Sequence, residues 1–200
     1  MSPSPLDALR SWVARTVDDL AASRRSIRGI PVSVVNSRPD IDTALVCARL
    51  DAALGLIETW QPWRFRRLRH DLAGIRVSRF PCRAAYFPHT RTCLVELTFL
   101  ANPAFTEAQI AASIVHEGVH ARLHNVGVRL PPEEHAREER LCRRAELELG
   151  LAVPDGAAVV ERARQSLQLA DEDVAPEIDW EVANRRVAEV DAAARPPRDA

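Results

Sequence analysis

The segment His116-Glu117-Gly118-Val119-His120 carries the side chains best suited to chemistry in this chain. Two histidines four residues apart lie on one face of a helix, about 6 Å apart, so both imidazoles can bind a single Zn²⁺ ion. Glu117 then lies beside the open position of that ion, where a carboxylate can take a proton from a bound water. The H-E-x-x-H pattern therefore predicts a zinc site with Glu117 as general base.

The elements around the motif must hold it in place. Thr106, with Gln109 three residues later, predicts a capping box, and apolar residues follow it at helical spacing until Gly127. Residues 75–77, 84–87 and 93–99 are predicted to be short strands, with prolines between them as turn residues. We therefore expect a small antiparallel sheet that precedes the helix of the motif.

The rest of the chain is predicted to be mostly helical, which gives an α+β fold. Apolar spacing predicts helices at residues 6–22, 41–60 with Asp40 as N-cap, 63–73, 133–149 and 178–190. We interpret the chain as one compact domain with three parts. These are an N-terminal helical region (1–74), a metal-binding core (75–150) and an acidic C-terminal helical extension (151–200).

A catalytic zinc ion needs a third protein ligand. His124 lies eight residues after His116, a rise of about 12 Å on a straight helix, so these two and His120 cannot share one tetrahedral ion. The longer pattern with a third histidine is absent, because Val126 stands at that position. Cys142 is a possible soft ligand, although a small apolar side chain on the inner face of a helix needs no such role.

With the glutamates that follow, the motif resembles the zincin-like metallopeptidases of gluzincin type. In that group a glutamate on the next helix, some twenty residues after the second histidine, completes the metal site. Glu139 and Glu138 lie at this distance, and Glu146 is a further alternative. We prefer Glu139, because Cys142 and Glu146 share its face of the predicted helix.

By layout the chain also resembles the ImmA/IrrE-type peptidases. The likeness departs from their Glu-x-x-Ala-Asp/Asn signature, since Leu141 and Cys142 fill its last two places. The resemblance covers about a third of the chain and implies that an extended peptide lies beside an edge strand, here expected at residues 93–98. Tyr86 and His89, in or near the predicted hairpin, are candidates to polarise a carbonyl group.

The composition limits the other functions. The chain has 200 residues and a net charge of −1, and all 27 basic residues are arginine, which excludes lysine Schiff bases and P-loop phosphate binding. Four cysteines without a C-x-x-C pair indicate reduced thiols. With no apolar run of membrane-spanning length and no secretory signal, we expect a cytoplasmic protein.

The leading hypothesis is a zinc metallopeptidase that acts on a peptide or protein substrate, with zinc as its cofactor. The alternative is a non-catalytic zinc-binding sensor or interaction module. Arg64, Arg66, Arg67 and Arg69 interleave with aromatic residues as in a nucleic-acid patch. We favour pairing of these arginines with the acidic C-terminal part, and we expect neither a nucleic-acid nor a membrane partner.

Overall fold

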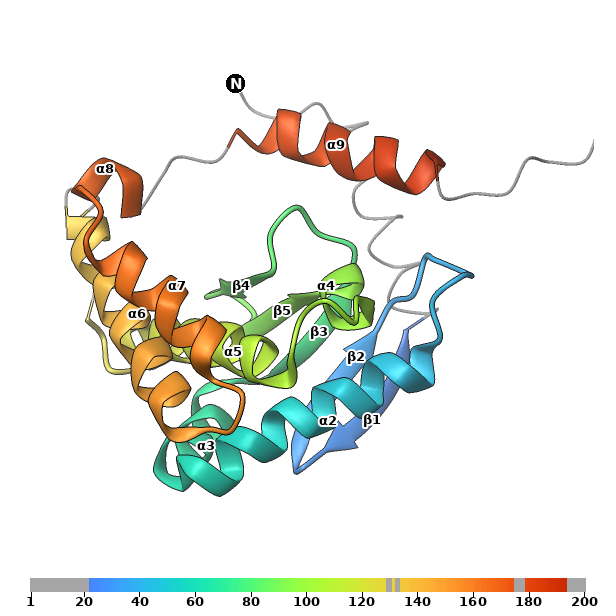
Figure 1. The fold of residues 1–200 in the computed structure, drawn as a ribbon. Helices are drawn as coiled ribbons and strands as arrows, with labels where there is room; N and C mark the ends of the chain where they lie inside the picture. The colour runs from blue at the N-terminus through green and yellow to red at the C-terminus, as the bar shows by residue number, and fades with distance from the viewer. Residues whose placement is uncertain (1–21, 129–130, 132–133, 175–178, 194–200) are drawn as a thin grey trace, which may run out of the picture.

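The computed structural model describes residues 22–128, 131, 134–174 and 179–193. Its elements, in chain order (Figure 1), are β1 (Ser23–Ile27), β2 (Ile30–Val34), α2 (Thr43–Trp60), α3 (Pro62–Asp71), β3 (Gly74–Ser78), β4 (Ala84–Phe87), β5 (Thr92–Glu96), α4 (Leu97–Ala101), α5 (Glu107–Asn125), α6 (His135–Ala152), α7 (Ala157–Leu167), α8 (Asp171–Val174) and α9 (Trp180–Ala193). The predicted α+β class is confirmed. The helix expected at residues 6–22 lies almost wholly outside the described part of the chain.

The five strands form one mixed sheet in the order β1-β2-β3-β5-β4. The outer pairs, β1 with β2 and β4 with β5, are antiparallel, whereas β2, β3 and β5 run parallel to one another. The expectation of a purely antiparallel sheet was therefore wrong. The helical connection α2–α3 makes β2 and β3 parallel, because it returns the chain to the same end of the sheet. β3 and β5 are parallel because the chain passes through the edge strand β4 before β5 enters the sheet between β3 and β4.

The hydrophobic core lies between the sheet and two long helices. Val32, Val77 and Val95 from the three parallel strands belong to one buried cluster with Leu54 of α2 and Ile114 of α5. Figure 1 shows α2 and α5 in front of the sheet; α6 packs against α5 at the left of the view, and α7 packs against α6. This arrangement places the motif of α5 between the sheet and α6.

Several elements differ from those predicted. Strands β1 and β2 occupy the part of the predicted N-terminal helical region between the expected helices 6–22 and 41–60, where no strand was predicted, and α7 was not predicted either. Helix α2 is capped by Asp42, whose carboxylate accepts a hydrogen bond from the Ala44 N–H, and not by Asp40. The strand expected at residues 93–99 ends at Glu96, because that carboxylate accepts the Phe99 N–H and starts α4. No helix among the described residues combines the length and the apolar character needed to cross a membrane.

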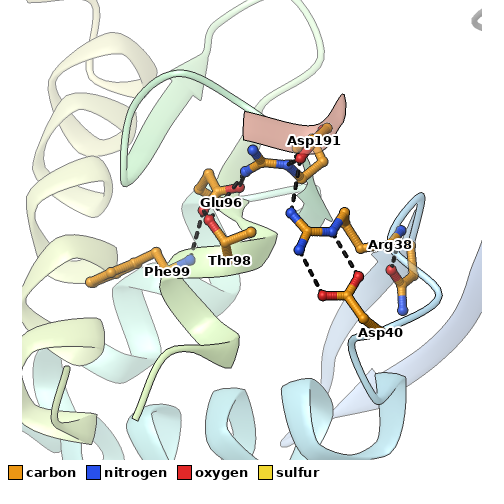
Figure 2. A network of polar contacts seen from close by, with 8 residues as sticks. Arg38, Asp40, Glu96, Thr98, Phe99 and Asp191 are labelled. Atoms are coloured by element: carbon orange, nitrogen blue, oxygen red, sulfur yellow. Dashed lines mark hydrogen bonds and ion pairs between the residues drawn. The ribbon is translucent and has the colours of Figure 1, made fainter. Parts of the chain in front are cut away.

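The carboxylate of Asp191 in helix α9 pairs with two arginines near the sheet (Figure 2). Asp191 accepts hydrogen bonds from Arg38 Nη1 at 3.0 Å and from Arg79 Nε at 2.9 Å. Arg79 also pairs with Glu96, and Arg38 pairs with Asp40 at 2.6 Å. Both arginine side chains are only 11–12% exposed, so this network links three distant parts of the chain in a largely dry environment.

Candidate metal centre

Helix α5 presents His116, Glu117 and His120 from a well-fixed position. Its first turn is closed by the predicted capping box, in which Thr106 and Gln109 each bond to the backbone of the other. Gly118 lies against the Leu68 side chain of α3, where a Cβ atom would overlap it. The glycine inside the motif thus allows α3 to pack directly on the helix that carries the candidate ligands.

The two histidines and Glu139 of α6 converge on one point. The Nε2 atoms of His116 and His120 are 3.2 Å apart, and the Glu139 carboxylate places one oxygen 3.2 Å from each of them. A tetrahedral zinc ion with bonds of about 2.0–2.2 Å to nitrogen and oxygen separates its ligand atoms by about 3.3–3.5 Å. The three donor groups therefore already stand close to the separations that such an ion needs.

The other ring nitrogen of each histidine is held by a second carboxylate. Glu146 Oε1 lies 2.7 Å from His116 Nδ1, and Glu138 Oε1 lies 2.7 Å from His120 Nδ1. When each Nδ1–H donates to its carboxylate, each Nε2 lone pair is free to face the shared point. Carboxylates in this position fix the orientation of metal-binding imidazoles and increase their basicity.

Glu146 is the most deeply buried of these carboxylates, with a side chain only 1% exposed. Besides His116, it accepts hydrogen bonds from Arg143 Nη1 and from Arg162 Nη2 of α7, each at 2.7 Å. Burial acts to raise the pKa of Glu146, but the hydrogen bond from His116 and the nearby charges outweigh it and lower the pKa. Glu146 is therefore a buried anion that is stabilised by His116, Arg143 and Arg162.

The histidines and the carboxylates of the site stabilise each other's charged forms. Burial acts to lower the pKa of His116, yet its hydrogen bonds to Glu139 and Glu146 raise that pKa to about 10. The same imidazoles outweigh the burial of Glu139 and hold the pKa of its carboxyl far below the ordinary value. Protons on the histidines thus neutralise the carboxylates, and a metal ion would displace them.

Glu117 points away from this group and toward strand β4. Burial raises the pKa of its carboxyl, while a hydrogen bond from the backbone N–H of Tyr86 and the two nearby histidines act in the opposite direction. The residue is buried, with 8% of its surface exposed. It is thus a buried carboxylate with a raised pKa beside the convergent donors, as a general base requires.

A cavity of about 970 Å³ opens onto these groups. His116, Glu117, His120 and Glu139 line one part of it, and strand β4, from Ala84 to Tyr86, lines another. Strand β4 is an edge of the sheet, whereas the strand expected to be the edge, β5, is paired on both sides. That expectation was wrong because four of the five residues of β5 are buried, and the strand lies between β3 and β4.

The structure separates the remaining candidates. The Tyr86 hydroxyl lies 3.1 Å from His124 Nδ1, and both residues line the cavity, so His124 contacts the tyrosine and not the convergent donors. His89 also lines the cavity, from an exposed turn after β4. The orienting positions of Glu138 and Glu146 were not foreseen; the stripe of Glu139, Cys142 and Glu146 on one helix face was a signal for Glu146, whereas Glu138 was considered only as an alternative ligand.

A further donor atom lies at the same point. The Sγ atom of Cys142 is 3.5 Å from His120 Nε2, and the side chain is completely buried. Donor atoms of His116, His120 and Cys142 all lie within 4.8 Å of one another, so these three residues could hold a metal ion. Glu139, whose two oxygens each face one histidine, is not part of that group. The site therefore offers two imidazoles, one carboxylate and one thiol.

No protein-family model, curated protein or solved structure matches this chain. The chemistry of the site thus has to be argued from its own residues: two imidazoles fixed by carboxylates, a third carboxylate facing both, and a buried glutamate beside them.

Proposed function

We propose that this protein is a zinc-dependent metallopeptidase. The proposal depends on one observation: the Nε2 atoms of His116 and His120 lie 3.2 Å apart, and each lies 3.2 Å from a different oxygen of Glu139, next to a cavity that Glu117 also lines. Two imidazoles and a carboxylate are a ligand set typical of catalytic zinc, which leaves a position for water. A purely structural site would not need a carboxylate at position 117.

Each residue has a distinct task in this proposal. When bound, zinc supplies a Lewis acid that lowers the pKa of a water molecule to about 7. Glu117 would act as the general base: its carboxylate would accept a proton from the attacking water and would return it to the leaving amine of the peptide. Its raised pKa favours this second step, because a carboxyl group of ordinary acidity holds a proton less readily. Glu138 and Glu146 keep the two imidazoles in the required orientation.

Strand β4 suits the binding of an extended peptide. The Arg83 carbonyl accepts the Glu96 N–H, so Arg83 and Ala85 direct their backbone groups toward β5. Ala84 and Tyr86 therefore direct theirs to the free edge, where the Tyr86 N–H already donates to Glu117. A peptide that replaces Glu117 as the acceptor of the Tyr86 N–H when it pairs with this edge would pass beside the general base, which is why we propose a peptide in extended conformation as substrate.

The proposal gives the arginines of α3 a structural role. Arg64 pairs with Glu148 of α6 at 2.6 Å, and Arg64 and Arg67 stack on the Trp63 ring. These contacts support packing of α3 on the helix that carries Glu139, in place of nucleic-acid binding. We also propose the cytoplasm as compartment, since all four cysteines are free thiols.

The proposal is tested with Glu117→Gln, which keeps the size of the side chain and an acceptor for the Tyr86 N–H. The variant should retain one zinc per chain while its hydrolysis of peptides falls about 10²–10⁴-fold, the usual contribution of a positioned general base. Zinc is measured by elemental analysis, and new termini are detected by mass spectrometry in a library of peptides with many cleavage contexts.

Glu148→Gln is the matched control, since Glu148 is an exposed glutamate on α6 that does not line the cavity. It should cleave as the wild type does, and a chelator should stop both. Metal-dependent cleavage by Glu117→Gln at the wild-type rate would refute the assignment of the base. A wild-type protein that neither contains nor takes up a divalent transition metal would remove the proposal altogether.

A further inference from the structure

Cys142 has a position that a packing role does not explain. It lies one helical turn after Glu139 and one turn before Glu146 on the inner face of α6, and its side chain is completely buried. Its sulfur is directed at His120 Nε2, the same ring nitrogen that faces His116 and Glu139. A cysteine with only a packing role needs no polar contact for its sulfur, whereas the sulfur of Cys142 contacts a ring nitrogen of a candidate ligand.

The distance from this sulfur has the value expected of a ligand. Tetrahedral zinc, with bonds of about 2.0–2.1 Å to nitrogen and about 2.3 Å to sulfur, separates those two atoms by about 3.5–3.6 Å. The Sγ atom of Cys142 lies 3.5 Å from His120 Nε2. The cysteine thus lies as close to its histidine as a fourth ligand would.

We infer that Cys142 supplies a thiolate as the fourth ligand, so that His116, His120, Glu139 and Cys142 together close the metal site in the resting protein. The inference rests on the proposed metal site and names its regulation. Zinc sites with four protein ligands are closed, whereas catalytic sites keep one position open. The sulfur therefore occupies the place that water needs, and it must move away before Glu117 has a substrate water.

Formation of the closed state is a simple exchange. The thiol gives up its proton, the sulfur binds the ion through the freed electron pair, and the proton passes to solvent. No oxidant or reductant takes part, so the closed and open states differ only in whether the sulfur or a water is bound.

The test is the absorption spectrum of the full chain loaded with Co²⁺, which reports a thiolate ligand directly. The wild type should show visible bands of a tetrahedral ion together with a near-ultraviolet band from thiolate-to-cobalt charge transfer. Cys142→Ser should lose the near-ultraviolet band and bind the ion more weakly, by at least the 10–100-fold that loss of an orienting group costs. Cys142→Ala serves as a second variant if the serine variant does not fold.

Cys82→Ser is the matched control, because Cys82 lines the same cavity. It should keep both kinds of band. Cobalt bound in the wild type without a charge-transfer band, or a band that persists in Cys142→Ser, would overturn the inference and leave the proposed metal site intact. A wild type that binds no cobalt would instead remove the proposed function, and the inference with it. In the peptide assay, Cys142→Ala should cleave faster than the wild type at saturating zinc.

Discussion

Glu146→Gln tests whether the carboxylate beneath His116 holds the site together. The substitution keeps the shape of the side chain but removes its charge and one of its two acceptor oxygens. Oε1 receives His116 and Arg143, and Oε2 receives Arg162. A glutamine that keeps its oxygen toward His116 must turn its NH₂ group toward Arg162, so that two donors face each other.

The expected effect has two parts. Removing one partner of a buried ion pair costs about 3–5 kcal/mol, and here the lower end applies, because the Arg143 and Arg162 side chains are 22% and 30% exposed and can reach water. We therefore expect a loss of about 3 kcal/mol in the unfolding free energy of the metal-free protein. Zinc affinity should fall about 10–100-fold, since His116 loses the anion that orients it.

Urea unfolding in the presence of a chelator measures the first part, and competition with a chromophoric chelator measures the second. Glu148→Gln is the control. It removes a charge only two residues from Glu146, but Glu148 is 61% exposed and forms an ion pair with Arg64. Exposed pairs contribute about 0–1 kcal/mol. If both variants unfold at the same urea concentration and bind zinc equally well, Glu146 does not support the site.

Three further predictions concern the ligands, the protons and α9. Glu139→Ala should weaken zinc binding far more than Glu138→Ala in chelator competition, since a ligand is worth more than an orienting group, and equal affinities would reassign the third ligand. His116 has a pKa raised to about 10 in the folded chain, so its stabilising effect is complete below pH 6.5 and lost as the pH rises toward 10. The urea midpoint of the metal-free protein should fall over that range, and a flat or rising midpoint would contradict this. Asp191→Ala should release α9, because two largely buried arginines lose their shared partner, and limited proteolysis should then cut residues 180–193 first. Unchanged cleavage would mean that other contacts hold the helix.

Local signals in the sequence predicted α5 and its motif well. The capping box of Thr106 and Gln109 and the spacing of His116 and His120 depend on neighbours within a few residues, which a helix fixes. The approach of Glu139 was expected only from the resemblance to gluzincins. Its distance to both histidines depends on how α6 packs against α5, which no local pattern specifies.

What the sequence analysis missed depends on long-range contacts. Gly29 and the alternation of Ile30, Val32 and Val34 were a readable signal for the β1–β2 hairpin, whose turn has positive φ at Arg28 and Gly29. The parallel pairing of β3 with β5 could not be read in the same way, because it joins residues on either side of the β4 excursion. The partners of Glu146 likewise come from three helices, α5, α6 and α7, and the helix that supplies Arg162 was not predicted.

The free edge of β4 also bears on how the chain avoids pairing with itself. Open strand edges are templates for aggregation, and proteins protect them with short strands, prolines and charges. Strand β4 has four residues, lies between Pro81 and Pro88, and has its outward Tyr86 N–H occupied by the Glu117 carboxylate. A side chain at position 117 without an acceptor would leave that N–H open to a neighbouring molecule. The Glu117 carboxylate that we propose as the general base therefore also covers the Tyr86 N–H, a backbone donor through which a second copy of the chain could pair with this edge.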